Sequence, residues 1–275
     1  MEPGREIFLF FIDAHCHINS KQLRKDASSV VDRAVRAGVK RLLTSGSDLR
    51  RSAEAVELAQ IYSADGVYAT VGVHPHEAIS AADGLPEELL KLAESPRVVA
   101  IGEAGLDYYY DHSPRNVQRN VFQAHIDWAL NVNKPLVIHV RNADRDTLAM
   151  DNAIEILSGV PKLPVLMFHC YAGGLRYMDA MKKLDAYISI AGPVTWAKND
   201  ELRAVAAAAP AERILCETDA PWLSPQAYRG KLNEPAYVRF VYETIAKERG
   251  LSLDELARTM DANASRLFGW EALYV

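Results

Sequence analysis

The sequence predicts a (β/α)8 barrel of the TIM type, in which eight parallel strands alternate with helices and close into a ring. Apolar runs rich in Val, Ile and Leu recur at intervals of roughly 25 to 35 residues, and amphipathic or alanine-rich stretches fill the gaps. The length of 275 residues suits such a barrel, which typically needs about 250 residues. The alternative, an open doubly wound sheet, would carry a glycine-rich phosphate turn after its first strand, and the sequence has none there.

The order of the elements follows from these runs. The expected strands are residues 7–14, 39–46, 67–74, 97–104, 135–141, 164–170, 186–192 and 213–220. The helix-like segments include residues 28–38, 52–66, 116–133, 201–210 and 235–250. Residues 251–270 predict an extra C-terminal helical pair, and Ser252 and Glu255 have the spacing of a capping box. No linker or repeat interrupts the pattern, which indicates one barrel domain over residues 1–275.

The composition, with 49% hydrophobic and 24% charged residues, is typical of a soluble globular protein. The apolar stretch 7–12 is too short to span a membrane and lacks a small-residue cleavage site, so we interpret it as a buried strand. The three cysteines form neither a disulfide framework nor a CxxC zinc site, and they favour a reducing compartment, with the cytoplasm as the default. Nothing in the sequence predicts an obligate protein partner.

The formal net charge of −5 excludes the strongly basic field typical of many nucleic-acid-binding domains. It does not exclude a nucleic-acid substrate, because bound divalent metals can supply positive charge where the carboxylates lie. Lys21, Arg24 and Lys25 form a charge-dense stretch after the first strand. Two interpretations fit this stretch: its side chains contact a nucleic-acid backbone, or they form the solvated face of a helix.

Polar side chains of metal-binding types gather at the ends of the predicted strands. They are His15, His17, His74, Glu103, His139, Arg141, His169 and Asp219. In a barrel these positions meet at the carboxyl-terminal mouth, where such enzymes keep their sites. One histidine at a strand end could be structural, but this many at the same end predict a metal site.

The ligand types indicate which metals would bind. Four histidines, a glutamate and an aspartate suit Zn²⁺, Mn²⁺ or Fe²⁺ better than Ca²⁺. Six ligands also exceed what one catalytic zinc uses, so two metals that share a carboxylate fit better. Such a pair activates water for hydrolysis of a phosphate ester. Asp219, in CETDAPWLSP, is placed to serve as ligand and proton acceptor.

Seven motifs occur along most of the chain. In order they are DAHCH (13–17), GVHPH (72–76), IGEAGLDYY (101–109), PLVIHVRNA (135–143), FHCYAG (168–173), ETDAPW (217–222) and RGKLNEP (229–235). Together they resemble the TatD family of metal-dependent deoxyribonucleases, within the amidohydrolase-like metal-dependent hydrolases. The resemblance implies a distorted (β/α)8 barrel and a divalent-metal-dependent phosphodiesterase, typically a 3′–5′ exonuclease on DNA.

The resemblance also implies roles for single residues. It assigns His15, His17 and Asp219 to a first metal, His139 and His169 to a second, and Glu103 to the bridge between them. Glu103 and Asp219 would be the catalytic carboxylates, with Asp219 as the base. The cofactors would be two divalent ions, with Zn²⁺, Mn²⁺ and Mg²⁺ as candidates, and the partner would be DNA or another phosphodiester.

Further residues near the mouth have weaker assignments. We favour His74 as a substrate or outer-sphere residue. Arg141 shares a strand face with His139 and would contact either a phosphate oxygen or a nearby carboxylate. Asp107 and Asp13 are expected to orient ligand histidines. Tyr108 and Tyr109 would stack on a base or pack beneath the loop, with packing expected for at least one of them.

Two other functions compete with the nuclease. An amidohydrolase acting on a lactone, cyclic amide or small phosphoester would share the His-x-His opening, but it would usually carry a bridging lysine where this chain has Glu103. A non-catalytic barrel with a structural metal predicts a closed coordination shell. Cys16 lies between the two first histidines, and because strand side chains alternate, we expect it to face away from the metal as a buried filler.

Overall fold

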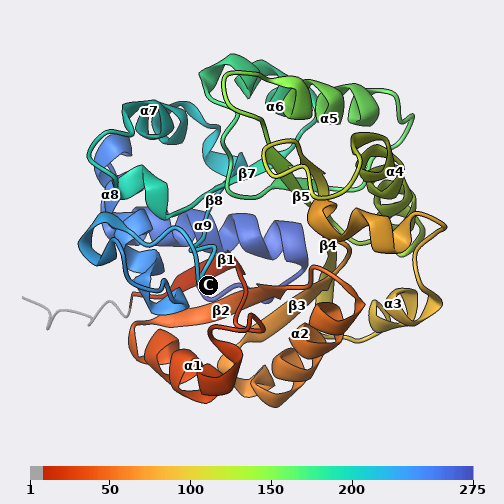
Figure 1. The fold of residues 1–275 in the computed structure, drawn as a ribbon. Helices are drawn as coiled ribbons and strands as arrows, with labels where there is room; N and C mark the ends of the chain where they lie inside the picture. The colour runs from red at the N-terminus through yellow and green to blue at the C-terminus, as the bar shows by residue number, and fades with distance from the viewer. Residues whose placement is uncertain (1–8, 275) are drawn as a thin grey trace, which may run out of the picture.

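The computed structural model describes residues 9–274 and confirms the predicted barrel. Eight strands form one sheet in sequence order, and each pairs in parallel with the next (Figure 1). The strands are β1 (Phe11–Cys16), β2 (Val39–Ser45), β3 (Val67–Val71), β4 (Val98–Asp107), β5 (Leu136–Arg141), β6 (Leu166–Phe168), β7 (Tyr187–Ile190) and β8 (Ile214–Cys216). Their carboxyl ends therefore meet at one mouth.

Helices surround the strands, as Figure 1 shows. They are α1 (Ala27–Arg36), α2 (Leu49–Ile61), α3 (Glu87–Leu92), α4 (Arg115–Asn131), α5 (Leu148–Ser158), α6 (Met178–Lys183), α7 (Asp200–Ala208), α8 (Val238–Arg249) and α9 (Leu253–Phe268). The strands are almost wholly buried between the helices and the barrel interior, which is why they are near-continuous apolar runs. None of the described helices is long and apolar enough to cross a membrane.

The ring closes where β8 meets β1. The backbone N–H of Asp219 donates to His15 O at 2.9 Å, and that of His17 donates to Ala220 O at 2.7 Å. These bonds lie just beyond the last ladder residue of β8, at the carboxyl ends of both strands. Closure thus brings residues from the two ends of the sequence together at the mouth.

The C-terminal helical pair consists of α8 and α9, so the range predicted for the pair supplies only its second helix. Residues 251–270 contain one helix, α9, which begins with the predicted capping box of Ser252 and Glu255 and packs on α8. The Asn263 amide donates to the carbonyls of Ala211 and Ile214, at 2.8 and 2.7 Å, next to the start of β8. Because these contacts lie at the amino end of that strand, α9 covers the end of the barrel opposite the mouth.

Several strand boundaries differ from the prediction. β6 and β8 stop after three residues each, because Cys170 (φ 44°) and Asp219 (φ 53°) adopt left-handed backbone conformations that break the extended chain. β4 instead continues to Asp107, so Glu103 lies within the strand and not at its end. The first two residues of the predicted strand 7–14, and the N-terminal extension before them, lie outside the described part of the chain.

Candidate metal centre

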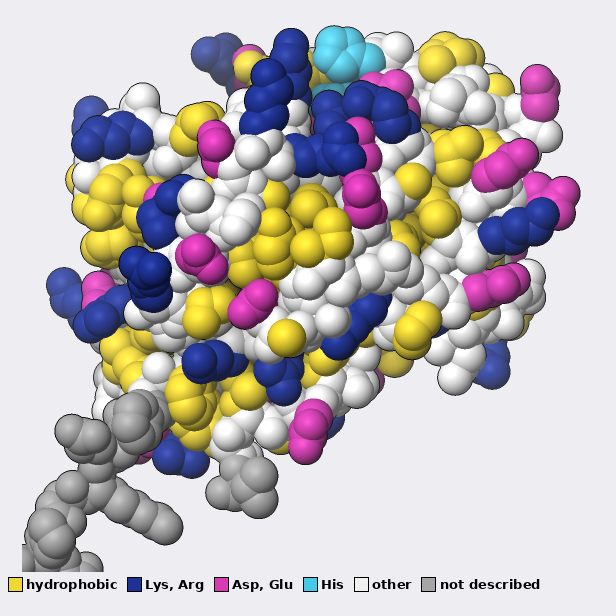
Figure 2. All heavy atoms as spheres, turned by 90° about the horizontal axis from the view of Figure 1, so that it is seen from below, with side chains coloured by type: hydrophobic (Ala, Val, Ile, Leu, Met, Phe, Trp, Pro, Cys, Tyr) yellow, Lys and Arg dark blue, Asp and Glu magenta, His cyan; other side chains and the backbone are white. Residues whose placement is uncertain are grey.

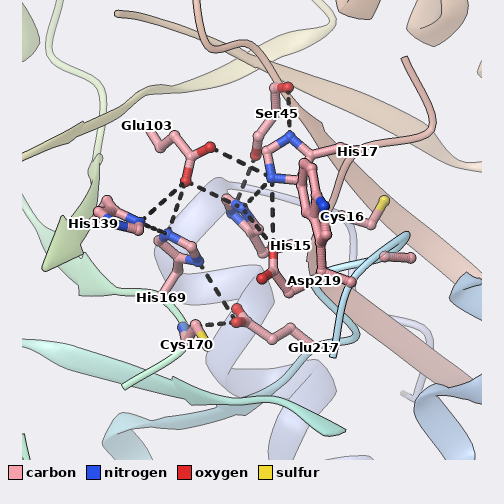
Figure 3. A network of polar contacts seen from close by, with 12 residues as sticks. His15, Cys16, His17, Ser45, Glu103, His139, His169, Cys170, Glu217 and Asp219 are labelled. Carbon is pink, nitrogen blue, oxygen red and sulfur yellow. Dashed lines mark hydrogen bonds and ion pairs between the residues drawn. The ribbon is translucent and has the colours of Figure 1, made fainter. Parts of the chain in front are cut away.

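The side chains predicted as metal ligands lie together at the mouth, with their polar atoms turned toward one another (Figure 3). Three groups have ligand atoms within 4.8 Å of one another: His15, His17 and Asp219; His74, Glu103 and His139; and His15, His169 and Glu217. The groups share members or ion-pair contacts, so they make up one continuous centre. All six predicted ligands belong to it.

The two histidines of β1 present ring nitrogens to this centre. Their Nε2 atoms lie 3.1 Å apart, while the opposite nitrogens contact Ser45: His17 Nδ1 lies 3.2 Å from its carbonyl oxygen and His15 Nδ1 lies 3.1 Å from its hydroxyl. Since a carbonyl can only accept, His17 carries its proton on Nδ1 and turns the Nε2 lone pair toward the centre. Metal-binding histidines are commonly oriented in this way.

His139 has a similar arrangement with its two ring nitrogens exchanged. Its Nε2 lies 3.1 Å from Asp107 Oδ2, so the proton resides there and the Nδ1 lone pair faces His169 Nε2, 3.1 Å away. Asp107 therefore orients the ring of His139, one of the predicted ligands. It also accepts a hydrogen bond from His76 Nε2 at 2.9 Å. Burial alone would raise the pKa of Asp107, but these two histidines outweigh burial and hold it below its usual value.

Glu103 lies between the two histidine pairs. Its Oε1 is 3.4 Å from His17 Nε2, and its Oε2 is 3.6 Å from His15 Nε2 and 2.8 Å from His169 Nε2. The β4–β5 register shifts between Ile101 and Ala104, which places Glu103 in an irregularity of the strand. The preceding residue must be glycine, because Gly102 has φ 124° and a Cβ there would lie 2.4 Å from Val137 O.

The charge balance of this buried cluster suits a divalent cation. Burial would raise the pKa of Glu103, but the charges of His17 and His169 outweigh it and hold that pKa well below its usual value. Burial would conversely lower the pKa of His17 and His169, but the Glu103 carboxylate raises both. The buried carboxylates thus require positive charge beside them, and a metal ion supplies the charge that protons otherwise provide.

Glu217 belongs to the centre although it was not predicted. It is fully buried, its Oε1 accepts from the Cys170 N–H at 2.6 Å, and Ser189 donates to its Oε2. Its Oε1 also lies 3.7 Å from His169 Nδ1, a buried nitrogen that has no hydrogen-bond partner within residues 9–274. The sequence reasoning that pointed to Asp219 could also have pointed to Glu217, which lies two residues earlier, because alternate residues of an extended segment share a face.

Asp13 has a different role from the one predicted. Its carboxylate accepts from the backbone N–H of Thr218 at 2.8 Å and from the Thr218 hydroxyl at 2.6 Å, and it forms no hydrogen bond with an imidazole of the described residues. It therefore positions the segment that carries Asp219 and does not orient a histidine ring. The prediction was wrong because β8 closes against β1 and brings Thr218 within reach. Cys16 is buried as expected, with its sulfur turned away from the centre and 3.2 Å from Leu43 O (Figure 3).

His74 lies beside Glu103 and His139 but differs from the other histidines. Its Nδ1 accepts the backbone N–H of His76 at 3.1 Å, so the neutral ring carries its proton on Nε2 and turns a donor toward the centre. Burial, followed by the nearby His139, lowers the pKa of His74 well below its usual value, which keeps the ring neutral. A neutral donor of this kind suits an anionic oxygen.

Arg141 lies against aromatic rings and not against a carboxylate, one of the two contacts considered for it. Its guanidinium lies over the rings of Tyr109 and Tyr110, 4.3 and 4.8 Å from their centroids, and it forms no ion pair with the described residues. Both tyrosine rings are exposed, whereas Tyr108 is buried and donates to Asn152. Across the centre, the exposed Trp222 packs edge-to-face on His17. Aromatic surfaces therefore flank the metal centre on two sides.

Comparison with known proteins agrees with this geometry. A family model described as TatD related DNase matches residues 12–269. The chain is 36% identical to the uncharacterized metal-dependent hydrolase YabD of Bacillus subtilis over 258 residues, which is 93% of this chain and 98% of that protein. It is 37% identical to the 3′-5′ ssDNA/RNA exonuclease TatD of Escherichia coli K12, over 94% of this chain and 98% of that protein.

Solved structures show the same fold. The crystal structure of YjjV, a TatD homologue from Escherichia coli K12, superposes with a TM-score of 0.84 at 25% identity, and the match covers 96% of this chain and all of that one. The match to the family model spans nearly the whole chain, as do the matches to both relatives. The chain therefore belongs to the TatD family of metal-dependent hydrolases.

Proposed function

We propose that the protein is a 3′–5′ exonuclease that hydrolyses phosphodiester bonds of DNA with the help of two divalent metal ions. One observation carries the proposal: two sets of ligand nitrogens face the same buried carboxylate, Glu103, from opposite sides. A centre with one shared carboxylate suits two ions better than one. The relative named as a 3′-5′ ssDNA/RNA exonuclease supports nucleic acid as the substrate.

The contacts support a division of the ligands. His15, His17 and Asp219 would hold the first ion, since both Nε2 atoms lie within 3.7 Å of Asp219 Oδ1. His139 and His169 would hold the second, and Glu103 would bridge the two. When bound, the ions would activate a water molecule and hold the non-bridging oxygens of the scissile phosphate. Zn²⁺, Mn²⁺ and Mg²⁺ are the candidates.

The chain's own groups would move the proton and hold the substrate. Asp219 has a side chain 13% exposed, against 4% for Glu103, so it is the carboxylate that water at the mouth reaches most easily. We assign it the proton-accepting role. His74 Nε2 would donate to a phosphate oxygen, and Arg141 would add positive charge at the same rim.

The aromatic surfaces beside the centre favour a single strand. Trp222, Tyr109 and Tyr110 are 48%, 43% and 49% exposed, respectively. Such rings stack on unpaired bases regardless of sequence, each stacked base contributing about 1 to 3 kcal/mol. A duplex would have to unpair before its bases could reach them. The site therefore suits unpaired 3′ ends.

The test is turnover by protein reconstituted with Mg²⁺, Mn²⁺ or Zn²⁺. It is incubated with single-stranded DNA labelled at its 5′ end, and in parallel with a panel of lactones and cyclic amides. A ladder of products that shorten from the 3′ end is expected, and the matching strand capped with a 3′ phosphorothioate linkage should resist. If a lactone is turned over while the DNA stays intact, the protein is instead an amidohydrolase. No turnover of any substrate by metal-loaded protein would favour a structural metal.

A further inference from the structure

A groove lined by basic side chains lies between residues 21–28, which lead into α1, and helix α2. Its volume is about 630 Å³, and the charged residues that line it are Lys21, Arg24, Lys25, Arg50, Arg51, Glu54 and Glu57. The five basic and two acidic side chains leave an excess of three positive charges, in a chain whose net charge is −5. Figure 2 shows Lys and Arg side chains gathered along the upper edge of the face that carries α1 and α2.

The groove's arginines are held in place by two carboxylates. Glu54, which is mostly buried, forms ion pairs with Arg24 at 3.2 Å, with Arg50 at 3.3 Å and with Arg51 at 2.7 Å. Glu57 also pairs with Arg24, at 2.8 Å. Two negative charges thus arrange three guanidinium groups and neutralise only two of them. Preorganised arginines of this kind suit phosphate oxygens, because their donors are already fixed in position.

Two lysines complete the positive surface. Lys21 follows β1, and Lys25 lies in the short 3-10 helix Arg24–Asp26 that precedes α1. Both are exposed, and neither forms an ion pair with the described residues. Their charges are therefore available to a ligand in the groove.

A chain of hydrogen bonds connects the groove to the metal centre. Arg51 donates to Asn19 O at 2.9 Å, and the Asn19 amide donates to Ser45 O at 3.0 Å. The same carbonyl orients the ring of His17. Arg51 of the groove is therefore connected, through Asn19, to the carbonyl that orients a proposed metal ligand, so the groove and the metal centre belong to the same side of the barrel.

We infer that this groove holds the sugar-phosphate backbone of the substrate strand, upstream of the linkage that is cleaved; this inference rests on the proposed function. The lining carries seven charged side chains and one aromatic ring, Tyr62, beside a few aliphatic side chains, so we expect it to bind phosphates and not to stack several bases. Its volume falls in the range of pockets for small ligands, roughly 300 to 1,000 Å³, which limits it to a short segment of the strand. Long strands would thus gain affinity that short ones lack.

The test compares substrates that reach the groove with one that does not. In the double variant Lys21→Ala/Lys25→Ala, the KM for a 20-nucleotide single strand is expected to rise roughly 5- to 30-fold with kcat unchanged. The kcat/KM for bis(p-nitrophenyl) phosphate, which occupies the metal centre alone, should stay the same. The control Lys182→Ala/Lys183→Ala removes two exposed lysines at the end of α6, away from the mouth. It should leave the kinetic constants for both substrates unchanged.

A binding measurement separates this inference from the proposed function. Affinity for a 5′-fluorescein 20-mer is measured by anisotropy in EDTA, where no turnover occurs. The slope of log affinity against log salt should fall in magnitude by about 1.4 in the groove variant, because two phosphate contacts are lost. If the wild type cleaves no DNA, a reduced slope still supports the groove and only the nuclease assignment fails. An unchanged slope, equal losses on both substrates, or preference for an acidic peptide over DNA would overturn the inference.

Discussion

Two regions of this molecule bury histidines, and they use them differently. On α4, His125 is fully buried, with Nδ1 placed 2.7 Å from Val121 O and Nε2 accepting the Val73 N–H at 3.0 Å. Both ring nitrogens thus pair with the backbone. At the mouth, His17 and His139 each pair one nitrogen with Ser45 or Asp107 and turn the other toward neighbouring histidines and carboxylates.

The difference lies in the partners and not in the burial. A structural histidine satisfies both nitrogens with the protein, as His125 does, and needs nothing more. The mouth histidines leave lone pairs facing one another, and a bound cation would accept these lone pairs. Four predictions test this contrast, from the largest expected effect to the smallest.

Replacing Glu103 by Ala should remove the shared carboxylate and abolish metal-dependent turnover. Losing about 4 kcal/mol of transition-state stabilisation lowers the rate roughly 10³-fold. The barrel should remain folded, since the Glu103 carboxylate contacts the histidines of the mouth and is not part of the apolar core. Turnover is measured with saturating metal, and circular dichroism checks the fold. Near-normal turnover would exclude Glu103 from the centre.

The variant His125→Gln should lack the pH dependence that His125 gives to the unfolding free energy. It should bind metal as the wild type does. Burial lowers the pKa of His125 from 6.5 to about 4. Between these values the unfolded chain binds a proton and the folded chain does not, so acid lowers the unfolding free energy of the wild type, by about 3 kcal/mol in total.

The measurement is urea unfolding in EDTA at several pH values between about 7 and 4. The advantage of the wild type over His125→Gln should shrink steadily as the pH falls. A constant difference across that interval would show that His125 is not held neutral. Metal affinity near neutral pH should be equal in the two proteins, since both nitrogens of His125 are engaged by the backbone.

The variant Asp107→Asn should weaken metal binding about 10- to 100-fold, because it removes the acceptor that orients His139. The amide oxygen can still accept the N–H groups of Tyr109 and Tyr110, so the loop should keep its shape. Isothermal titration with Mn²⁺ gives the affinity. The matched control is Asp261→Asn, a buried carboxylate that accepts the backbone N–H groups of Leu273 and Tyr274 near the C-terminus and should leave the affinity unchanged.

The smallest effect is expected for Ser45→Ala. This change removes the hydroxyl that contacts His15 Nδ1 and keeps the carbonyl that orients His17. One neutral hydrogen bond contributes about 1 kcal/mol, so Mn²⁺ affinity should fall roughly fivefold. A loss as large as that of Asp107→Asn would mean that the hydroxyl does more than hold one ring.

Much of this organisation could be predicted from the chain alone. The barrel follows from the spacing of the apolar runs, and His15, His17, His139 and His169 follow from their positions at strand ends. Both depend on local periodicity, which a single sequence displays directly. Cys16 faces outward for the same reason, since side chains alternate along a strand.

The remainder depends on how distant segments meet. Asp13 contacts Thr218 only because β8 closes against β1, 205 residues along the chain. Arg141 stacks on two tyrosines of the loop after β4, a contact set by loop geometry. Glu103 projects from an irregularity within β4, and the left-handed backbone at Asp219 shortens β8. The local periodicity of the sequence does not indicate these features.

The central claim is that the mouth histidines and Glu103 hold two metal ions. Anomalous diffraction from crystals grown with Mn²⁺ tests it most directly. The account predicts two peaks per chain: one among His15, His17 and Asp219, and one between His139 and His169, with Glu103 contacting both. A single peak, or manganese bound away from Glu103, would contradict it.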